Sequence, residues 1–155
     1  MTATPARLAV SDAMTPDPAC CLASTPLLEV ARMLVEHDCG AIPVVDTRIG
    51  KKPVGIVTDR DIACRVVAEG RDPAKLTAGD CMSRPCLTVD EETSLEDACR
   101  LMEANRIRRI VVVGPSGKCR GILSQADIAR HASGEKTAEV VRRVSQPTQS
   151  ASTVA

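Results

Sequence analysis

Phe, Tyr and Trp are absent from the 155-residue sequence. A hydrophobic core must therefore consist of Val, Ile, Leu, Met and Ala, and single-stranded nucleic acid would find no aromatic ring on which to stack. An excess of charge of one sign is lacking as well, because 20 basic and 20 acidic side chains give a formal net charge of +0. This balance argues against a protein whose main partner is a nucleic-acid backbone.

Metal-ligand and catalytic patterns are also lacking. The sequence has only two histidines, His37 and His131, and none of its eight cysteines forms a Cys-x-x-Cys pair. We expect buried or half-buried thiols in a reducing compartment, whereas a zinc site is the alternative that the ligand spacing does not support. No nucleophile, base and acid stand in a recognisable set, so we do not expect an enzyme. The eight cysteines of the sequence are Cys20, Cys21, Cys39, Cys64, Cys81, Cys86, Cys99 and Cys119.

Long apolar runs are missing too. No stretch reaches the roughly 18 apolar residues of a membrane-spanning helix, and the N-terminus lacks the charged start and apolar run of a signal peptide. The sequence therefore predicts a cytoplasmic protein without a membrane partner.

An internal repeat organises the sequence. A shift of 68 residues takes Leu8, Asp12 and Met14 onto Leu76, Asp80 and Met82, and it takes Ile42, Val44 and Val45 onto Ile110, Val112 and Val113. The shift then falls to 66 residues, at which Gly55, Ile56, Asp61 and Ile62 match Gly121, Ile122, Asp127 and Ile128. Because the register persists through several elements, we expect two copies of one structural unit.

Each copy predicts the order β-α-β-β-α, and hence a mixed α/β fold (α+β). The predicted first helices have N-terminal caps at Thr25, followed by Pro26, and at Thr93 with Glu96 in a capping box. The apolar stripe of the first is Leu27, Val30, Ala31, Leu34 and Val35, and that of the second is Leu95, Ala98, Cys99 and Met102. We expect repeat 1 at 7–69, a linker at 70–75, repeat 2 at 76–133, a helix at 134–145 that packs on the body or on a partner, and a disordered tail at 146–155.

One motif ends the second strand of each copy: Gly, two aliphatic residues, Thr or Ser, two variable residues and Asp. It covers residues 55–61 and 121–127. Thr58 with Asp61, and Ser124 with Asp127, fit a helix cap, which alone would explain the spacing. They equally fit an anion or ligand site, because free N–H groups and the positive end of the helix dipole attract anions.

With these motifs in two copies, the sequence resembles a tandem pair of cystathionine-β-synthase (CBS) domains, also called a Bateman module. Residues 11–16 and 79–83 match the repeat openings of that family, and residues 41–46 match its first core strand. The layout is similar to that of small bacterial stand-alone pairs of the hypoxic-response type. The resemblance implies two repeats related by a pseudo-two-fold axis.

The resemblance also implies a site for an adenine nucleotide or adenosyl ligand, such as AMP, ADP, ATP, NAD or S-adenosylmethionine, in clefts between the repeats. Asp61 and Asp127 would then accept hydrogen bonds from ribose hydroxyls, and Thr58 and Ser124 would face the phosphate. Arg108 and Arg109 match basic phosphate contacts, although a solvated charged face is an equal reading. Their counterparts in the first copy are Gly40 and Ala41, which together with Pro43 would also contact the ligand. Because these residues carry no charge, we expect the cleft of the second copy to hold phosphate better than that of the first.

Two hypotheses follow. In the first, the protein is a non-catalytic sensor that needs no cofactor and regulates a protein partner. In the second, it is a ligand-free scaffold that pairs into a homodimer, by resemblance a four-repeat disc.

Overall fold

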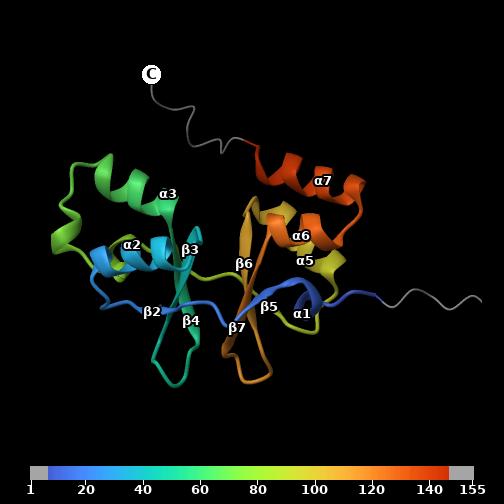
Figure 1. The fold of residues 1–155 in the computed structure, drawn as a ribbon, viewed down its shortest axis with the longest axis horizontal. Helices are drawn as coiled ribbons and strands as arrows, with labels where there is room; N and C mark the ends of the chain where they lie inside the picture. The colour runs from blue at the N-terminus through green and yellow to red at the C-terminus, as the bar shows by residue number, and fades with distance from the viewer. Residues whose placement is uncertain (1–6, 147–155) are drawn as a thin grey trace, which may run out of the picture.

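The computed structural model describes residues 7–146 as two small sheets that lie side by side (Figure 1). The predicted mixed α+β fold and its two repeats, related by a pseudo-two-fold axis, are confirmed. The predicted tail falls largely outside the described residues. In the first half, the elements are α1 (Val10–Ala13), β1 (Thr15–Pro16), β2 (Cys21–Leu22), α2 (Leu27–Glu36), β3 (Ala41–Val45), β4 (Pro53–Thr58), α3 (Asp59–Ile62) and the π-helix η1 (Ala63–Val67).

The second half shares the order α-β-α-β-β-α with the first, has an isolated bridge at Ser83 in place of strand β1, and ends in an additional helix. The elements are the 3-10 helix η2 (Pro73–Lys75), α4 (Ala78–Cys81), β5 (Thr88–Asp90), α5 (Leu95–Asn105), β6 (Arg109–Val113), β7 (Cys119–Ser124), α6 (Gln125–His131) and α7 (Gly134–Val144). In each half, a parallel pair of strands is followed by an antiparallel hairpin, β2-β3-β4 and β5-β6-β7. The two hairpin turns lie at the same end of the molecule (Figure 1).

The opening segment of each repeat packs on the other repeat. β1 pairs with β7, so that Thr15 stands opposite Ile122, and Ser83 forms the corresponding bridge with Ile56 of β4. Val10 and Ala13 of α1 lie in the core of the second half, whereas Ala78 and Cys81 of α4 lie in the core of the first. The halves therefore exchange their openings, and this exchange brings both repeats to each capping motif.

Two predicted helix caps are wrong by one residue. Helix α2 begins at Leu27 after Pro26, because the Thr25 hydroxyl instead accepts the N–H of Leu22 at 2.9 Å in a turn. Helix α5 is capped by Ser94, whose hydroxyl accepts the N–H of Asp97 at 3.1 Å. In both places a bridge to the opening of the other repeat keeps the residue before the helix extended.

The predicted apolar stripe of α5 is confirmed, since all four of its members are buried. In α2, Leu27 and Val30 are buried, but Val35 is 81% exposed and faces away from the core. The expectation of buried thiols is wrong for Cys39 and Cys64, which are both exposed. A third apolar cluster joins the two sheets and contains Val45, Val111 and Cys119.

Helix α7 packs on the body of its own chain rather than leaving it. Its Val140 and Val144 enter the core of the second half, and Lys136 forms an ion pair with Glu103 of α5 at 3.2 Å. Burial alone would lower the pKa of the Lys136 ammonium, but the hydrogen bond and charge of Glu103 outweigh it and raise that pKa. Among the described residues, none of the helices has the length and apolarity that a membrane crossing requires.

Candidate functional site

The capping motif forms the same structure in both repeats. The Thr58 hydroxyl accepts the N–H of Asp61 at 3.0 Å, and the Asp61 carboxylate accepts the N–H of Thr58 at 2.9 Å. Ser124 and Asp127 make the equivalent bonds at 3.2 and 2.9 Å. The capping interpretation is therefore correct, and these bonds fix each aspartate at the end of a strand.

Only one oxygen of each carboxylate is used by the cap. Asp61 Oδ1 accepts the Ser83 hydroxyl at 3.2 Å, and Asp127 Oδ1 accepts the Thr15 hydroxyl at 3.3 Å. An arginine one turn along each helix adds an ion pair, Arg65 at 3.7 Å from Asp61 and Arg130 at 3.1 Å from Asp127. A carboxylate oxygen has two acceptor sites, so Asp61 Oδ1 retains capacity for a ligand hydroxyl. At Asp127 Oδ1 a ligand hydroxyl would take the place of Thr15 or of the exposed Arg130.

Thr15 and Ser83 are site residues that the sequence reasoning missed. They follow Met14 and Met82 at the repeat shift of 68 residues, so a hydroxyl recurs at the same place in both copies. That recurrence was the available signal. Its meaning depends on the exchange of the opening segments, which puts each hydroxyl against the aspartate of the other repeat.

The glycine of each motif makes this exchange sterically feasible. A Cβ on Gly121 would come within 2.5 Å of Met14 Sδ and 2.9 Å of the Thr15 carbonyl oxygen. On Gly55 it would come within 2.7 Å of Met82 Sδ and 3.0 Å of the Ser83 carbonyl oxygen. Both glycines are therefore needed for close approach of backbone.

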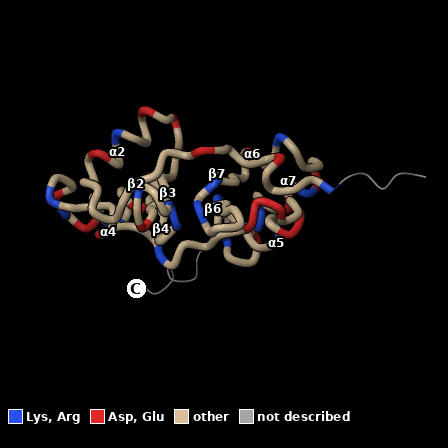
Figure 2. Tube along the Cα trace, turned by 90° about the horizontal axis from the view of Figure 1, so that it is seen from below, with Lys and Arg blue, Asp and Glu red and all other residues tan. Residues whose placement is uncertain are grey.

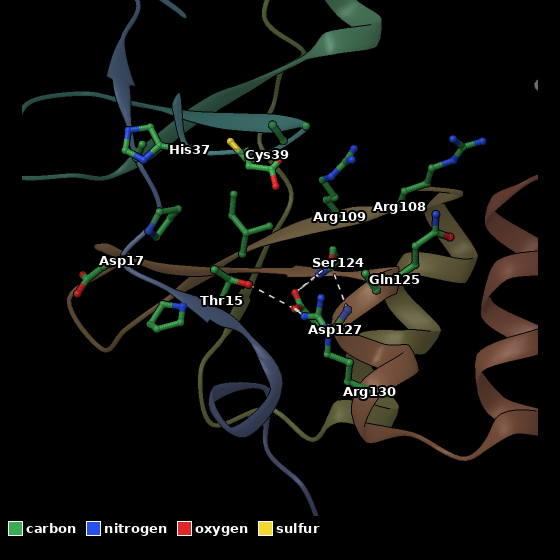
Figure 3. Close-up of a pocket in the computed structure, with 18 residues that line it drawn as sticks. Thr15, Asp17, His37, Cys39, Arg108, Arg109, Ser124, Gln125, Asp127 and Arg130 are labelled. Carbon is green, nitrogen blue, oxygen red and sulfur yellow. Dashed lines mark hydrogen bonds and ion pairs between the residues drawn. The ribbon is translucent and has the colours of Figure 1, made fainter. Parts of the chain in front are cut away.

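A cleft of about 440 Å³ contains Asp127 and Ser124 (Figure 3). Its volume lies in the range of small-molecule sites, roughly 300–1,000 Å³. The buried Asp127, 4% exposed, lies on one side, and Arg108 and Arg109 extend away from it (Figure 3). The remaining walls come from the crossing segment 15–19 and from the turn before β3, residues 37–41, which includes Gly40 and Ala41.

The other cleft, of about 560 Å³, contains Thr58 and Asp61 and is called the Asp61 cleft. Asp61 is also buried, at 9% exposed. The segment 106–109 forms the opposite wall, and Val144, Ser145 and Gln146 at the end of α7 border the opening. The charged residues of the two clefts differ: four arginines and two aspartates line the Asp61 cleft, whereas three arginines and three aspartates line the Asp127 cleft.

The expected difference between the clefts rests on Arg108 and Arg109 belonging to one cleft, and that premise is wrong. Arg108 and Arg109 line both clefts, and Gly40 and Ala41 line the Asp127 cleft rather than the Asp61 cleft. The reason is that each cleft lies between the repeats and takes walls from both. With Arg60 and Arg106 added, the Asp61 cleft is the more basic of the two.

Gly40 leaves room for one of these arginines. A Cβ at Gly40 would collide with the guanidinium of Arg109, so the two repeats meet there without a side chain between them. Pro43 does not belong to this site, because it is buried within β3 opposite Ile56 and lines neither cleft.

Charged residues of both signs line the clefts. Basic and acidic positions are spread over both halves of the molecule (Figure 2). In the part of the chain that the structure describes, no three His, Cys, Asp or Glu side chains come together in a way that would hold a metal ion. The geometry is thus that of two polar clefts, each lined by a carboxylate that a capping box fixes and by Arg108 and Arg109.

The sequence is similar to those of curated relatives over most of its length. Hypoxic response protein 1 of Mycobacterium tuberculosis is 33% identical over 123 residues, which cover 78% of this chain and 82% of that protein. The uncharacterized protein MK0525 of Methanopyrus kandleri is 37% identical over 101 residues, which cover 65% of this chain but only 50% of that protein. The chain therefore spans about half the length of the second relative.

Solved structures share the fold. Hypoxic Response Protein I with two coordinated zinc ions has a TM-score of 0.72 at 31% identity, over 81% of this chain and all of that one (100%). CBSX2 of Arabidopsis thaliana in complex with AMP has a TM-score of 0.67 at 30% identity, over 79% and 93% of the two chains. The CBS domain pair of MJ0100, in complex with 5′-methylthioadenosine and S-adenosyl-L-methionine, has a TM-score of 0.71 at 27% identity, over 80% and 94%.

The sequence model of the CBS domain matches twice, at residues 10–67 and 78–134. Each match contains one capping motif with its glycine and its aspartate. Because the two matches together cover well over half of the sequence, the chain belongs to the CBS domain family and carries a pair of these domains.

Proposed function

We propose that this protein is a non-catalytic regulatory module that binds an adenine nucleotide or adenosyl ligand in the clefts between its two CBS domains. The observation that carries the proposal is the pairing, in each cleft, of a buried carboxylate with the arginines 108 and 109. Asp61 and Asp127 accept ribose hydroxyls through their Oδ1 atoms, and Arg108 and Arg109 hold a phosphate. Thr58 and Ser124 keep each aspartate in place and face the ligand.

The chemistry of the walls fits such a ligand. In the absence of aromatic side chains, the base lies against aliphatic surface, which Pro16, Pro18, Ala19 and Ile122 supply in the Asp127 cleft. Gly40 and Ala41 bring main-chain groups to the same cleft without bulk. Two structural relatives support the ligand class, because CBSX2 was solved with AMP and the MJ0100 pair with adenosyl compounds.

Calorimetry and thermal unfolding with AMP, ADP, ATP, NAD and S-adenosylmethionine test this proposal. A ligand at 100 times its dissociation constant is expected to add about 2.7 kcal/mol to the free energy of unfolding. The double variant Asp61→Asn/Asp127→Asn is expected to bind at least about tenfold more weakly, since a charge-assisted hydrogen bond contributes about 1.5–3 kcal/mol. Asparagine retains one oxygen for the helix cap.

A matched control is the double variant Asp90→Asn/Asp97→Asn, which changes two exposed aspartates outside both clefts. Its ligand affinity is expected to equal that of the unmodified protein. The proposal is wrong if no ligand of the panel changes the unfolding temperature, or if the control variant loses as much affinity as the cleft variant.

The scaffold hypothesis has one observation in its favour. Leu28 and Val35 are both exposed and lie seven residues apart on α2, and therefore on one face of that helix. A homodimer, or docking of a regulated protein partner, would cover such a face. Light scattering at micromolar concentration decides between a monomer and the proposed dimer, and Val35→Glu is the variant expected to shift the mass toward the monomer.

A further inference from the structure

The wall of the Asp127 cleft leads directly to a pair of cysteines. After β1, residues 17–19 line the cleft, and the N–H of Asp17 donates to the carbonyl oxygen of Arg120 at 3.1 Å. This bond extends the antiparallel pairing of β1 with β7 toward the first residue of β7, Cys119. Cys20 follows the cleft wall at this point.

The two thiols lie in one apolar cluster. Cys20 packs against the cluster between the sheets that contains the buried Cys119, and each thiol perturbs the pKa of the other. Cys20 comes from the first CBS domain and Cys119 from the second. A bond between these sulfur atoms would therefore connect the two domains.

The surroundings give the two thiols different reactivity. The neighbouring Cys119 thiol and the charge of Lys51 lower the pKa of Cys20 despite its burial, whereas the Cys20 thiol and burial raise the pKa of Cys119. By contrast, burial raises the pKa of Cys21 to about 12 and that of Cys86 to about 11. Since the thiolate is the nucleophile, Cys20 reacts first within this group.

Cys20 is also accessible to a small reagent. It is half-buried and lines a surface hollow of about 310 Å³ together with Arg48 and Lys51. Cys119 is buried behind it. An oxidant thus meets Cys20 before Cys119, and the basic side chains at the hollow stabilise a thiolate.

We propose that Cys20 and Cys119 form a peroxide-oxidisable dithiol whose disulfide locks the wall of the Asp127 cleft. The Cys20 thiolate attacks one oxygen of hydrogen peroxide, the O–O bond breaks, and a sulfenic acid forms while hydroxide leaves and takes up a proton to become water. The Cys119 sulfur then attacks the Cys20 sulfur. The S–O bond breaks, the S–S bond forms, and hydroxide leaves with the Cys119 proton as a second water.

The disulfide acts on the cleft through the chain on either side of it. Segment 15–19 would be tied to β7, and β7 ends at Ser124 of the capping box. Both are walls of the Asp127 cleft, so oxidation restricts how far this cleft can open. The dithiol does not depend on the proposed nucleotide binding, but its effect on ligand affinity does.

Oxidation of the full chain tests the dithiol. The exposed cysteines are first replaced, as Cys39→Ser/Cys64→Ser, to prevent links between chains. Peroxide treatment is expected to remove two thiols and to yield a Cys20–Cys119 peptide in mass spectrometry without reduction, and dithiothreitol is expected to reverse it. In Cys119→Ser, dimedone is expected to trap a sulfenic acid at Cys20, whereas the matched variant Cys86→Ser still forms the disulfide.

A disulfide that uses Cys86 or Cys21 instead, or oxidation of Cys20 no faster than that of a buried thiol such as Cys99, overturns the proposal. Amide exchange at Asp17 reports the lock and is expected to slow about tenfold on oxidation. AMP affinity is expected to differ at least about threefold between the reduced and oxidised forms. If AMP binds neither form while the disulfide maps as expected, the proposed function fails and the dithiol stands; equal affinity in both forms refutes the lock.

Discussion

The contact between the two CBS domains depends on two glycines and two hydroxyl residues. Gly55 and Gly121 allow the crossing segments to lie directly on β4 and β7, and Ser83 and Thr15 then reach the carboxylates. The helix cap and the crossing segment bind different oxygens of the same carboxylate, so a substitution of that aspartate disturbs both contacts.

Gly121→Ala is therefore expected to destabilise the protein by about 1–3 kcal/mol, because its Cβ overlaps Met14 Sδ and the Thr15 carbonyl oxygen. Chemical denaturation measures the free energy of unfolding. Gly134→Ala is the matched control, since no atom lies within 4 Å of its added Cβ. That variant is expected to be neutral or slightly stabilising. Equal losses for both variants would contradict the close approach.

Arg109 is the residue at which phosphate and nucleoside can be told apart. Its guanidinium lies over Gly40 and lines both clefts. Arg109→Gln is expected to weaken AMP binding about tenfold and to leave adenosine binding almost unchanged, because only AMP carries the phosphate. Calorimetry with both ligands measures this, with the exposed Arg32→Gln as control. An equal loss for the nucleoside would assign Arg109 to the shape of the cleft instead.

At the scale of elements, helix α7 completes the second half of the molecule. It covers α5 and α6, and its last turn borders the Asp61 cleft. The sequence left open whether this helix packs on the body or on a partner. The alternation of a buried Val140, 1% exposed, with Val141, 40% exposed, now shows which face packs inward.

Val140→Ala is expected to lower the free energy of unfolding by about 2 kcal/mol, because two buried methyl groups leave a cavity. The neighbouring Val141→Ala is expected to change it by no more than about 0.5 kcal/mol. Urea denaturation of both variants gives the comparison. A smaller loss of unfolding free energy for Val140→Ala than for Val141→Ala would show that α7 does not pack on the core through Val140.

The sequence predicted the elements whose signals are local. The strands, the capping boxes at Thr58 and Ser124 and the stripe of α5 follow from spacing and from residue type over a few positions. The caps at Thr25 and Thr93 were missed by one residue because bridges from the other repeat hold the preceding residues extended. Tertiary contacts, rather than local preference, decide such positions.

The site was predictable only in part for the same reason. Asp61 and Asp127 were found because their motif repeats, and both line a cleft. The sequence could not show which segment lies against these aspartates, because the residues of an opening segment are compatible with pairing to either sheet. The exchange that brings Thr15 to Asp127, and the sharing of Arg108 and Arg109, are properties of the assembled pair.

For the whole molecule, the consequence of this sharing is two unequal clefts. Both use Arg108 and Arg109, but Arg60 and Arg106 add positive charge on the Asp61 side, whereas Asp17 and Asp38 add negative charge on the Asp127 side. We therefore expect the Asp61 cleft to favour a polyanionic ligand and the Asp127 cleft to favour a ligand of low or positive charge.

ATP and S-adenosylmethionine differ in this respect, since one carries a triphosphate and the other a sulfonium cation. Asp61→Asn is expected to weaken ATP binding about tenfold more than Asp127→Asn does, and the order is expected to reverse for S-adenosylmethionine. Calorimetry of both variants with both ligands provides the four affinities. ATP affinity is further expected to fall as salt rises, because screening weakens the attraction of exposed arginines. If one variant loses both ligands and the other neither, charge does not divide the clefts, and a single cleft binds every adenosyl ligand.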